Sequence, residues 1–524
     1  MNWEEVTNLK LPVRGAGYRN IGLRQGALMT RTSLVALSLI ACGLIAVPAV
    51  AQDLALFQDP TPTTEAAPVS TSLDERLRAL EQEIATLKVT TAPKPAPTPD
   101  PLGMSAKWNN GLELTSQNKA FKIHVGGRTQ IDTVYWQNRD SFDNTGGATD
   151  QDAVNVRRGR LRVDGTIYEI IDFAAEYDFV NEFNVNPGTP ATEGNNAAVP
   201  AVTDLWVNFK EVPYVGNIKV GSFKDPIGME HLTSSRFLEF IERSPIQDTF
   251  TGSFNNGFLP GIQVGDTWDD EHGTWASGFF KNSTNIFDNG FGDGEFNWTS
   301  RVTYTPLYED EGEYMLHLGI AGSVREPNNE VLRYRSRPSL RNGAPSGLNP
   351  IFIDTTTFGC KQQDMLGLEV AGNYGSFSFQ SELMNSWAQD TVPGVGPLVG
   401  VNVGNTYVYS WYVEGLYFLT GEHREYERKQ GVFGRVKPHE NFKWGHGIGA
   451  WQLGARYSLT DLRDTGIDGG KLQDVTLGLN WFLNPNMKIQ TNYVYSYGNA
   501  PLIGAARGLD GAAHGAGTRL AIDF

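Results

Sequence analysis

Apolar and polar residues alternate along most of the chain from about residue 108 to residue 524. In residues 121–136 one face of the pattern is largely apolar, whereas the other carries Lys122, His124, Arg128, Gln130 and Asp132. Successive side chains of a β-strand point to opposite faces, so this period of two predicts strands with one apolar and one wet side. Sixteen such segments are expected, at residues 121–136, 153–168, 172–180, 202–210, 217–224, 258–268, 274–281, 296–306, 314–325, 363–374, 376–386, 406–420, 448–460, 470–483, 487–496 and 515–524.

The links between these segments alternate in length from the first strand onward. They are long at 137–152, 181–201, 225–257, 282–295 and 326–362, and short at 169–171, 211–216, 269–273 and 307–313. Bacterial outer-membrane barrels have an even strand number, long outer loops and tight periplasmic turns, and closure leaves no unpaired sheet edge in the bilayer. The pattern predicts an all-β fold, a transmembrane antiparallel β-barrel of about 16 strands over residues 105–524. One link, 421–447, is long although the alternation predicts a short turn at its position.

Both ends of the chain favour export to the outer membrane. Residues 1–51 are interpreted as a leader, in which Arg31 precedes an apolar run at 33–47 and an A-x-A cleavage site at 49–51, with Met29 as the working start of a secretory signal peptide. The run is shorter than the about 20 residues of a spanning helix. At the other end, the last predicted strand finishes on Phe524, and a terminal aromatic residue is typical of outer-membrane barrels.

The chain contains two cysteines. Cleavage after the leader would remove Cys42 and leave Cys360, so that no internal disulfide can form. An alternative interpretation takes residues 39–42 as a lipoprotein box, which would make Cys42 a lipidated first residue.

Residues 52–104 are expected to form a periplasmic tether of two extended Pro-rich linkers, 58–71 and 91–101, with a helix at 72–89 between them. Ser72 and Glu75 make a capping box at the start of this helix. Its apolar residues recur at alternating intervals of four and three, the a/d spacing of a coiled coil, and predict self-association; they are Leu73, Leu77, Leu80, Ile84 and Leu87. The alternative is an amphipathic helix that docks on a periplasmic or cell-wall partner.

Composition excludes several functions. A formal net charge of -16 argues against nucleic acid as a partner, because phosphate binding requires a basic surface. The 8 histidines are scattered, and the chain has no H-E-x-x-H or G-x-S-x-G motif. Neither an enzyme, a cofactor nor a metal site is expected.

Several stretches resemble the family of phosphate-selective porins O and P. They are residues 157–166 with 172–178, residues 221–226 through 233–236 to 242–244, residues 417–424 with 431–438, and residues 478–481. The resemblance covers about 400 residues and includes the long link at 421–447. It implies a homotrimer of sixteen-stranded barrels in outer-membrane lipid, passive flux of small anions such as phosphate, and a third outer loop that folds into the lumen as a constriction.

Eight basic residues are candidates for an anion-binding, pore-lining role. Strand parity places Arg158, Arg160 and Arg162 on the wet side of one strand, with Arg128 on the adjacent strand, and guanidinium groups offer fixed donors to oxyanions. Lys219 lies at an inward position, and the expected constriction segment, 224–243, adds Lys224, Arg236 and Arg243. The alternative is a salt-bridge belt, in which these arginines pair with Asp132, Asp164, Glu176 and Asp178 and stiffen the wall.

The sequence leaves three functions open. The first is an outer-membrane porin for passive diffusion of small anions, with the basic residues as its filter. The second is a nonspecific diffusion channel with a structural role, which tethers the envelope through the N-terminal coiled coil. The third is a barrel enzyme acting on lipid or peptide, for which no grouping of Ser or Asp with His is visible in the sequence.

Overall fold

A computed structural model describes residues 72–90, 103–137, 152–180, 201–251, 257–281, 295–341, 351–500 and 509–524. The chain divides into two units, residues 1–96 and 97–524. The expected signal peptide, the lipoprotein box at Cys42 and both Pro-rich linkers lie outside the described residues. No helix in the described part of the chain is long and apolar enough to cross a membrane.

The first unit contains one helix, α1 (Leu73–Thr90). The predicted capping box begins it, because the Ser72 backbone N–H donates to the Glu75 carboxylate at 3.2 Å. Leu77, Leu80 and Ile84 are 50%, 56% and 50% exposed, so the apolar stripe of the helix has no partner within the described residues.

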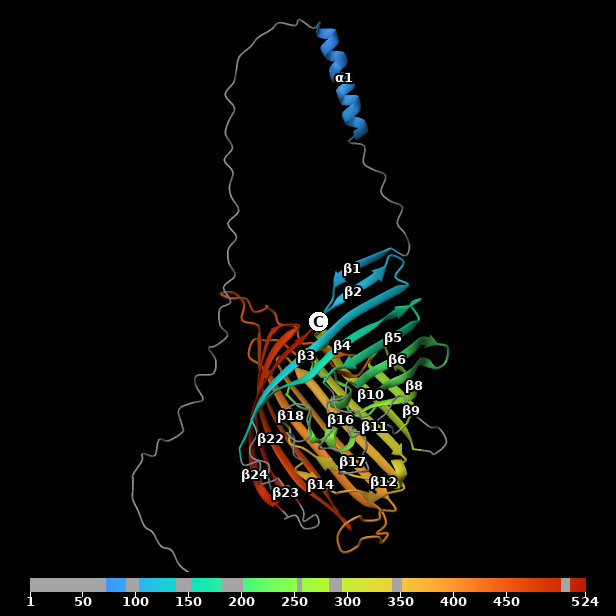
Figure 1. The fold of residues 1–524 in the computed structure, drawn as a ribbon, viewed down its shortest axis with the longest axis vertical. Coiled ribbons are helices and arrows are strands. Elements are labelled where there is room, and N and C mark those ends of the chain that lie inside the picture. Colours follow the sequence, from blue (N-terminus) through green and yellow to red (C-terminus); the bar gives the residue numbers. More distant parts are fainter. Residues whose placement is uncertain are drawn as a thin grey trace, which may run out of the picture. The chain divides into compact units, whose positions relative to one another are not determined.

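The second unit is a closed barrel of sixteen long antiparallel strands (Figure 1), and the all-β prediction is confirmed. Each strand pairs with the next, and β24 pairs with β3 to close the sheet, so no barrel edge is left unpaired. The sixteen strands are β3 (Phe121–Gln137), β4 (Ala153–Ile167), β5 (Ile171–Asp178), β6 (Ala201–Val212), β7 (Gly216–Lys224), β8 (Phe258–Trp268), β9 (Gly273–Lys281), β10 (Phe296–Glu309), β11 (Tyr314–Arg325), β16 (Gln362–Tyr374), β17 (Phe377–Gln389), β18 (Thr406–Phe418), β21 (Ala450–Asp464), β22 (Ile467–Asn484), β23 (Met487–Ala500) and β24 (Leu509–Asp523).

The two faces of the wall differ as the alternation predicts. Large apolar side chains on the outer face are exposed, among them Phe279 (58%), Trp298 (53%) and Leu477 (51%). The inner face is polar, and residues such as Arg456 and Arg519 are buried there at 2% and 0% exposure. This is the arrangement of a barrel with a lipid-facing exterior and a polar lumen.

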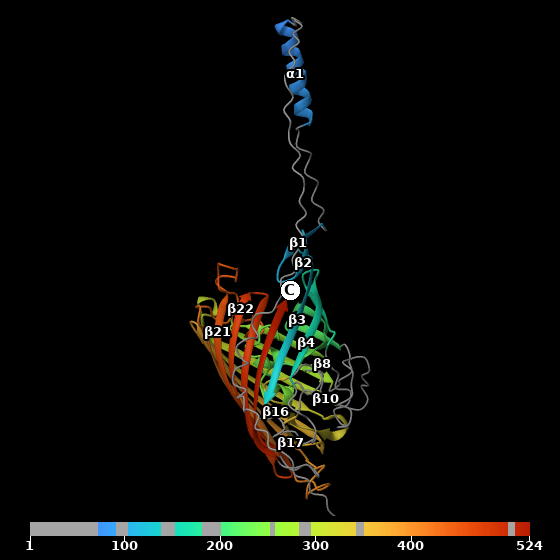
Figure 2. The same ribbon diagram turned by 60° about the vertical axis from the view of Figure 1, so that its left-hand side comes forward.

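A short hairpin extends the sheet at the end of the barrel where the short turns lie (Figure 2). The sequence pattern did not predict it. It consists of β1 (Met104–Trp108) and β2 (Leu112–Ser116), and β2 pairs with the first half of β3. The second half of β3 pairs with β24, and the chain ends at this junction. There the Gly127 and Phe524 backbones exchange two hydrogen bonds, of 2.5 and 3.0 Å.

Parts of three links fold into the barrel. The described residues of the link 225–257 contain α2 (Met229–Leu232) and the π-turn η3 (Gln247–Thr251), and several of them border the interior cavity, as the resemblance implies. Residues 326–361 contain η6 (Asn328–Glu330), β12 (Val331–Leu332), β13 (Arg335–Ser336), β14 (Ile353–Asp354) and β15 (Phe358–Gly359). Residues 419–449 contain β19 (Tyr426–Glu427) and β20 (Val432–Phe433), which explains why this link is long on the side of short turns. A 3₁₀ turn, η5 (Asp310–Gly312), joins β10 to β11.

Candidate functional site

The barrel encloses a cavity of about 980 Å³ that lies against one part of its wall. The described lining residues come from β3 to β10 and from the three inserted links. All eight basic residues predicted as pore-lining border this one cavity: Arg128, Arg158, Arg160, Arg162, Lys219, Lys224, Arg236 and Arg243. The structure therefore brings together every residue of the predicted site.

A β-bulge in β4 increases the number of arginines that face the lumen. Gln130 pairs with Arg158 and the next residue, Ile131, pairs with Val156, so Arg157 is the extra residue on β4. A bulge leaves one residue unpaired and re-aims its side chain. Here Arg157 points inward and binds the Glu242 carboxylate through Nε at 2.8 Å.

Three of the predicted arginines are neutralised by carboxylates of β4, β5 and β6. The Glu176 carboxylate binds the guanidinium groups of both Arg128 and Arg160, at 2.6 and 2.8 Å respectively. Arg160 also binds Asp178 at 2.7 Å. Arg162 binds Asp164 and Asp204 at 2.9 and 2.8 Å. These contacts match the salt-bridge belt interpretation, and they fix the guanidinium groups in place along the wall.

Other cations of the lining have no carboxylate partner within the described residues. Arg158 donates to the amide oxygen of Gln130 at 2.8 Å. Lys224 donates to the His231 carbonyl. Arg243 donates to two backbone carbonyls, those of Glu230 and Thr233, at 2.8 and 2.6 Å. These cations are held by neutral acceptors and form no ion pair with a described carboxylate.

Burial affects the loop arginines without removing their charge. It lowers the pKa of Arg236 to about 9 and that of Arg243 to about 10. Both values lie well above neutral pH, so both side chains stay protonated. Burial alone would raise the pKa of Glu242, but Arg157, Arg158 and Arg519 beside it hold that pKa well below its ordinary value.

The opposite part of the wall binds the inserted loop instead of lining the passage. The Glu382 carboxylate of β17 accepts from the backbone N–H groups of Met229 and Glu230 at 2.8 and 2.7 Å. Side chains of β21 to β24 bond the backbone between residues 238 and 242, namely Arg456, Asn480, Lys488, Gln490, Asn492 and Arg519. Because this part of the wall is occupied, the open passage is displaced toward β3 to β10.

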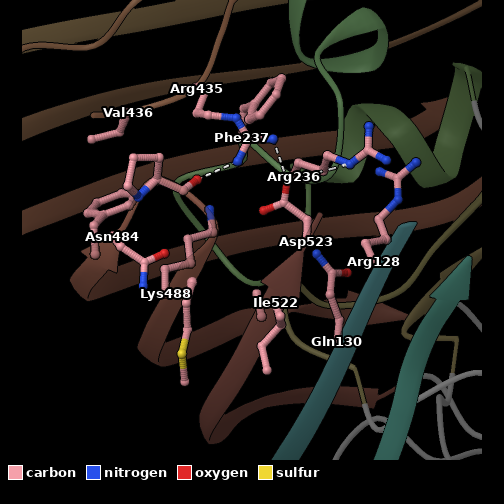
Figure 3. Close-up of a pocket in the computed structure, with 14 residues that line it drawn as sticks. Arg128, Gln130, Arg236, Phe237, Arg435, Val436, Asn484, Lys488, Ile522 and Asp523 are labelled. Carbon is pink, nitrogen blue, oxygen red and sulfur yellow. Dashed lines mark hydrogen bonds and ion pairs between the residues drawn. The ribbon is translucent and has the colours of Figure 1, made fainter. Parts of the chain in front are cut away.

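The loop meets the link 419–449 in a small pocket of about 20 Å³ beside the passage (Figure 3). Arg435 lies between the Phe237 ring, 5.2 Å from its centroid, and the Asp523 carboxylate of the last strand. Arg236 approaches the same carboxylate at 3.8 Å. The Asp523 carboxylate of β24 thus joins the loop, through Arg236, to the link 419–449, through Arg435.

Sequence reasoning missed part of the lining. Counting alternate positions along β4 assigns Arg157 to the outer face, because the pattern of apolar and polar residues does not reveal the bulge. Arg341 and Lys429 belong to links for which no inward position was expected, yet both border the cavity. The one signal available for Arg157 was its place in the stretch that resembles the porin family.

The charge of the lining is opposite to that of the chain. Among the described lining residues, thirteen are Lys or Arg and eight are Asp or Glu, which gives a net charge of +5. The whole chain carries -16. Clefts lined by one sign of charge concentrate ions of the other sign, so this passage favours anions. No group of His, Cys, Asp or Glu among the described residues is arranged to hold a metal ion.

Comparison with known proteins gives one family. The family model described as phosphate-selective porin O and P matches residues 123–522. Porin O of Pseudomonas aeruginosa is 27% identical over 429 residues, which cover 76% of this chain and 88% of that protein. An uncharacterised protein of Caulobacter vibrioides is 26% identical over 452 residues, covering 84% of this chain and 81% of that protein.

Two solved structures resemble the chain more distantly. An anion-selective porin from Comamonas acidovorans has a TM-score of 0.45 at 13% identity and covers 77% of this chain and 100% of its own. The outer-membrane channel DcaP of Acinetobacter baumannii has a TM-score of 0.46 at 11% identity and covers 78% of this chain and 99% of its own.

Proposed function

The chain belongs to the phosphate-selective porin O and P family, and from this premise we propose that its barrel carries small anions, phosphate among them, by passive diffusion. The protein is an outer-membrane porin, a channel and not an enzyme. Its exposed apolar exterior meets outer-membrane lipid.

The observation that supports the anion preference is the charge of the passage. Its described lining has a net charge of +5, whereas the whole chain has a formal net charge of -16. Arg128, Arg160 and Arg162 are fixed by ion pairs with carboxylates, whereas Arg158, Lys219, Lys224 and Arg243 form no ion pair with a described carboxylate. Arg236 lies at the contact of the loop with β24. An anion passing along this wall meets repeated sites of moderate strength, which allow it to enter and to leave.

Reversal potentials of the reconstituted full-length mature protein test the proposal. In a planar bilayer with a potassium chloride gradient, chloride should be more permeant than potassium, because the lining repels cations. Phosphate added to both sides should reduce the chloride current if it occupies the same arginines. A channel that prefers potassium would refute the anion preference, and chloride preference without competition by phosphate would limit the proposal to small anions in general.

We also propose that the protein is a homotrimer whose α1 helices associate. The support is the apolar stripe of Leu77, Leu80 and Ile84, exposed in the isolated chain and spaced as a coiled coil. Deleting residues 52–101 should leave the conductance intact and lower the stability of the oligomer in detergent. If the deletion instead detaches the outer membrane from the envelope with the oligomer unchanged, α1 binds a periplasmic or cell-wall partner.

A further inference from the structure

One cation of the lining differs from the others in what holds it. Lys219 of β7 forms no ion pair within the described part of the chain. Its ammonium nitrogen lies 4.1 Å from the centroid of the Trp206 ring and 4.6 Å from that of Phe223. All three residues border the 980 Å³ cavity. The ammonium group is therefore placed on aromatic faces at the surface of the passage, where a cation–π contact holds it without neutralising it.

The rings themselves are fixed. Trp206 is half-buried, and its indole N–H donates to Asp204 at 3.2 Å. Asp204 in turn accepts from Arg162 at 2.8 Å, so its charge is already paired. Phe223 is 1% exposed and packs with Leu259 and Phe280, and Trp206 packs against this cluster. The aromatic surface is thus a rigid part of the wall.

The wall beside these rings carries no side chain. Gly221 lies between Lys219 and Phe223 on β7 and pairs with Trp206 and with Gly261. Its φ is +134°, and an added Cβ would lie 2.6 Å from the Trp206 Cα. An added Cβ on Gly261 would lie 2.4 Å from the Phe280 ring. A side chain at either position would clash, so glycine at both lets the backbone pack closely against Trp206 and Phe280.

A cation that lies on an aromatic ring at the edge of a cavity complements a particular kind of anion. A small hydrated anion gains the charge of Lys219 but gains nothing from the Trp206 face. A carboxylate with a planar apolar body gains both, because its body stacks on the indole while its charged end reaches the ammonium group. We propose that Trp206 and Lys219, supported from behind by the buried Phe223, form a subsite for carboxylates that carry an aromatic or other flat apolar group. This proposal rests on the proposed anion channel and names a further substrate class for it.

The experiment compares benzoate with acetate as blockers of the chloride current through the full-length mature protein in a planar bilayer. Benzoate should half-block the current at a concentration about fivefold below that of acetate, as expected for one aromatic contact. Trp206→Leu should remove this difference. Trp298→Leu is the matched control, because Trp298 lies on the outer face and is 53% exposed there.

The outcomes separate this inference from the proposed function. Chloride preference in the wild type, with benzoate and acetate equally potent, overturns the subsite alone; so does a benzoate preference that survives in Trp206→Leu. Potassium preference in the wild type overturns the anion channel and the subsite together. Should Trp206→Leu fail to fold, the wild-type comparison of the two carboxylates still decides, and Lys219→Met should weaken the block by both.

Discussion

Replacing Arg158 with Gln should lower the chloride-to-potassium permeability ratio of the channel about thirtyfold at low salt. Arg158 borders the passage, and its charge is held by the neutral Gln130 amide. A unit charge about 4 Å from a passing ion contributes about 1 kcal/mol in a water-like dielectric. The charge attracts chloride and repels potassium by about this amount each, so its loss changes the ratio by about 2 kcal/mol. Since 1.4 kcal/mol is a factor of about ten, this is about thirtyfold.

The assay is the reversal potential across a planar bilayer in potassium chloride gradients. Salt screens charges over about 10 Å at 0.1 M and about 3 Å at 1 M. The effect of the substitution should therefore be large in gradients near about 0.1 M and small near about 1 M. An Arg158→Gln channel with the wild-type ratio at low salt, or with a deficit that persists at high salt, would refute the electrostatic reasoning.

The control removes an arginine without changing the net charge of the wall. Arg160 and Asp178 are joined at 2.7 Å, so the double variant Arg160→Gln with Asp178→Asn removes one charge of each sign. Its permeability ratio should equal that of the wild type. An equal decrease in this variant would mean that selectivity depends on the number of arginines and not on the uncancelled charge.

The remaining predictions concern stability and assembly. Arg519→Met should lower the free energy of unfolding by about 3–5 kcal/mol, because it leaves the buried Asp132 carboxylate without an ion-pair partner among the described residues, whereas Glu242 keeps Arg157. Arg463→Met, at an arginine that is 41% exposed in its ion pair with Asp461, should cost less than about 1 kcal/mol; equal losses in urea titrations would contradict this. Burial lowers the pKa of His231 from 6.5 to about 4, so the unfolded chain binds the proton first, and stability should fall by about 1.4 kcal/mol per pH unit as the pH drops from 6.5 toward 4. His231→Gln should remove that dependence when unfolding is measured across this range, and an unchanged slope would assign it to other groups. Gly126→Ala places a Cβ 2.4 Å from the Phe524 carbonyl oxygen and should slow formation of the folded, heat-modifiable band on gels, whereas Gly322→Ala, with 3.8 Å to its nearest neighbour, should assemble like the wild type.

The barrel strands could be predicted because their two faces meet different surroundings. A strand between lipid and water must alternate, and each of the sixteen predicted segments overlaps one strand of the barrel. The hairpin β1–β2 was missed because its strands have five residues each, too few for alternation to stand out. Its turn did carry a signal, since Asn110 and Gly111 both have positive φ and Asn-Gly is a favoured hairpin turn.

The passage could be predicted only in part, since it depends on contacts between distant segments. Parity found Arg158, Arg160 and Arg162, which share a strand, but the bulge at Arg157 depends on the register with β3. The position of Arg341 depends on how its link folds back into the barrel. No local pattern records such a contact, so the sequence indicates which strand residues face inward but not which part of the lumen stays open.

The bonds between residues 238–242 and β21 to β24 have a consequence for biogenesis. The chain makes this loop early, but the groups that hold its backbone, from Arg456 to Arg519, lie in the last four strands. A nascent barrel that lacks those strands cannot fix residues 238–242, although β17 already binds the loop at Met229 and Glu230. This part of the loop therefore takes its final place only when the wall closes, so that the bore is completed together with the barrel.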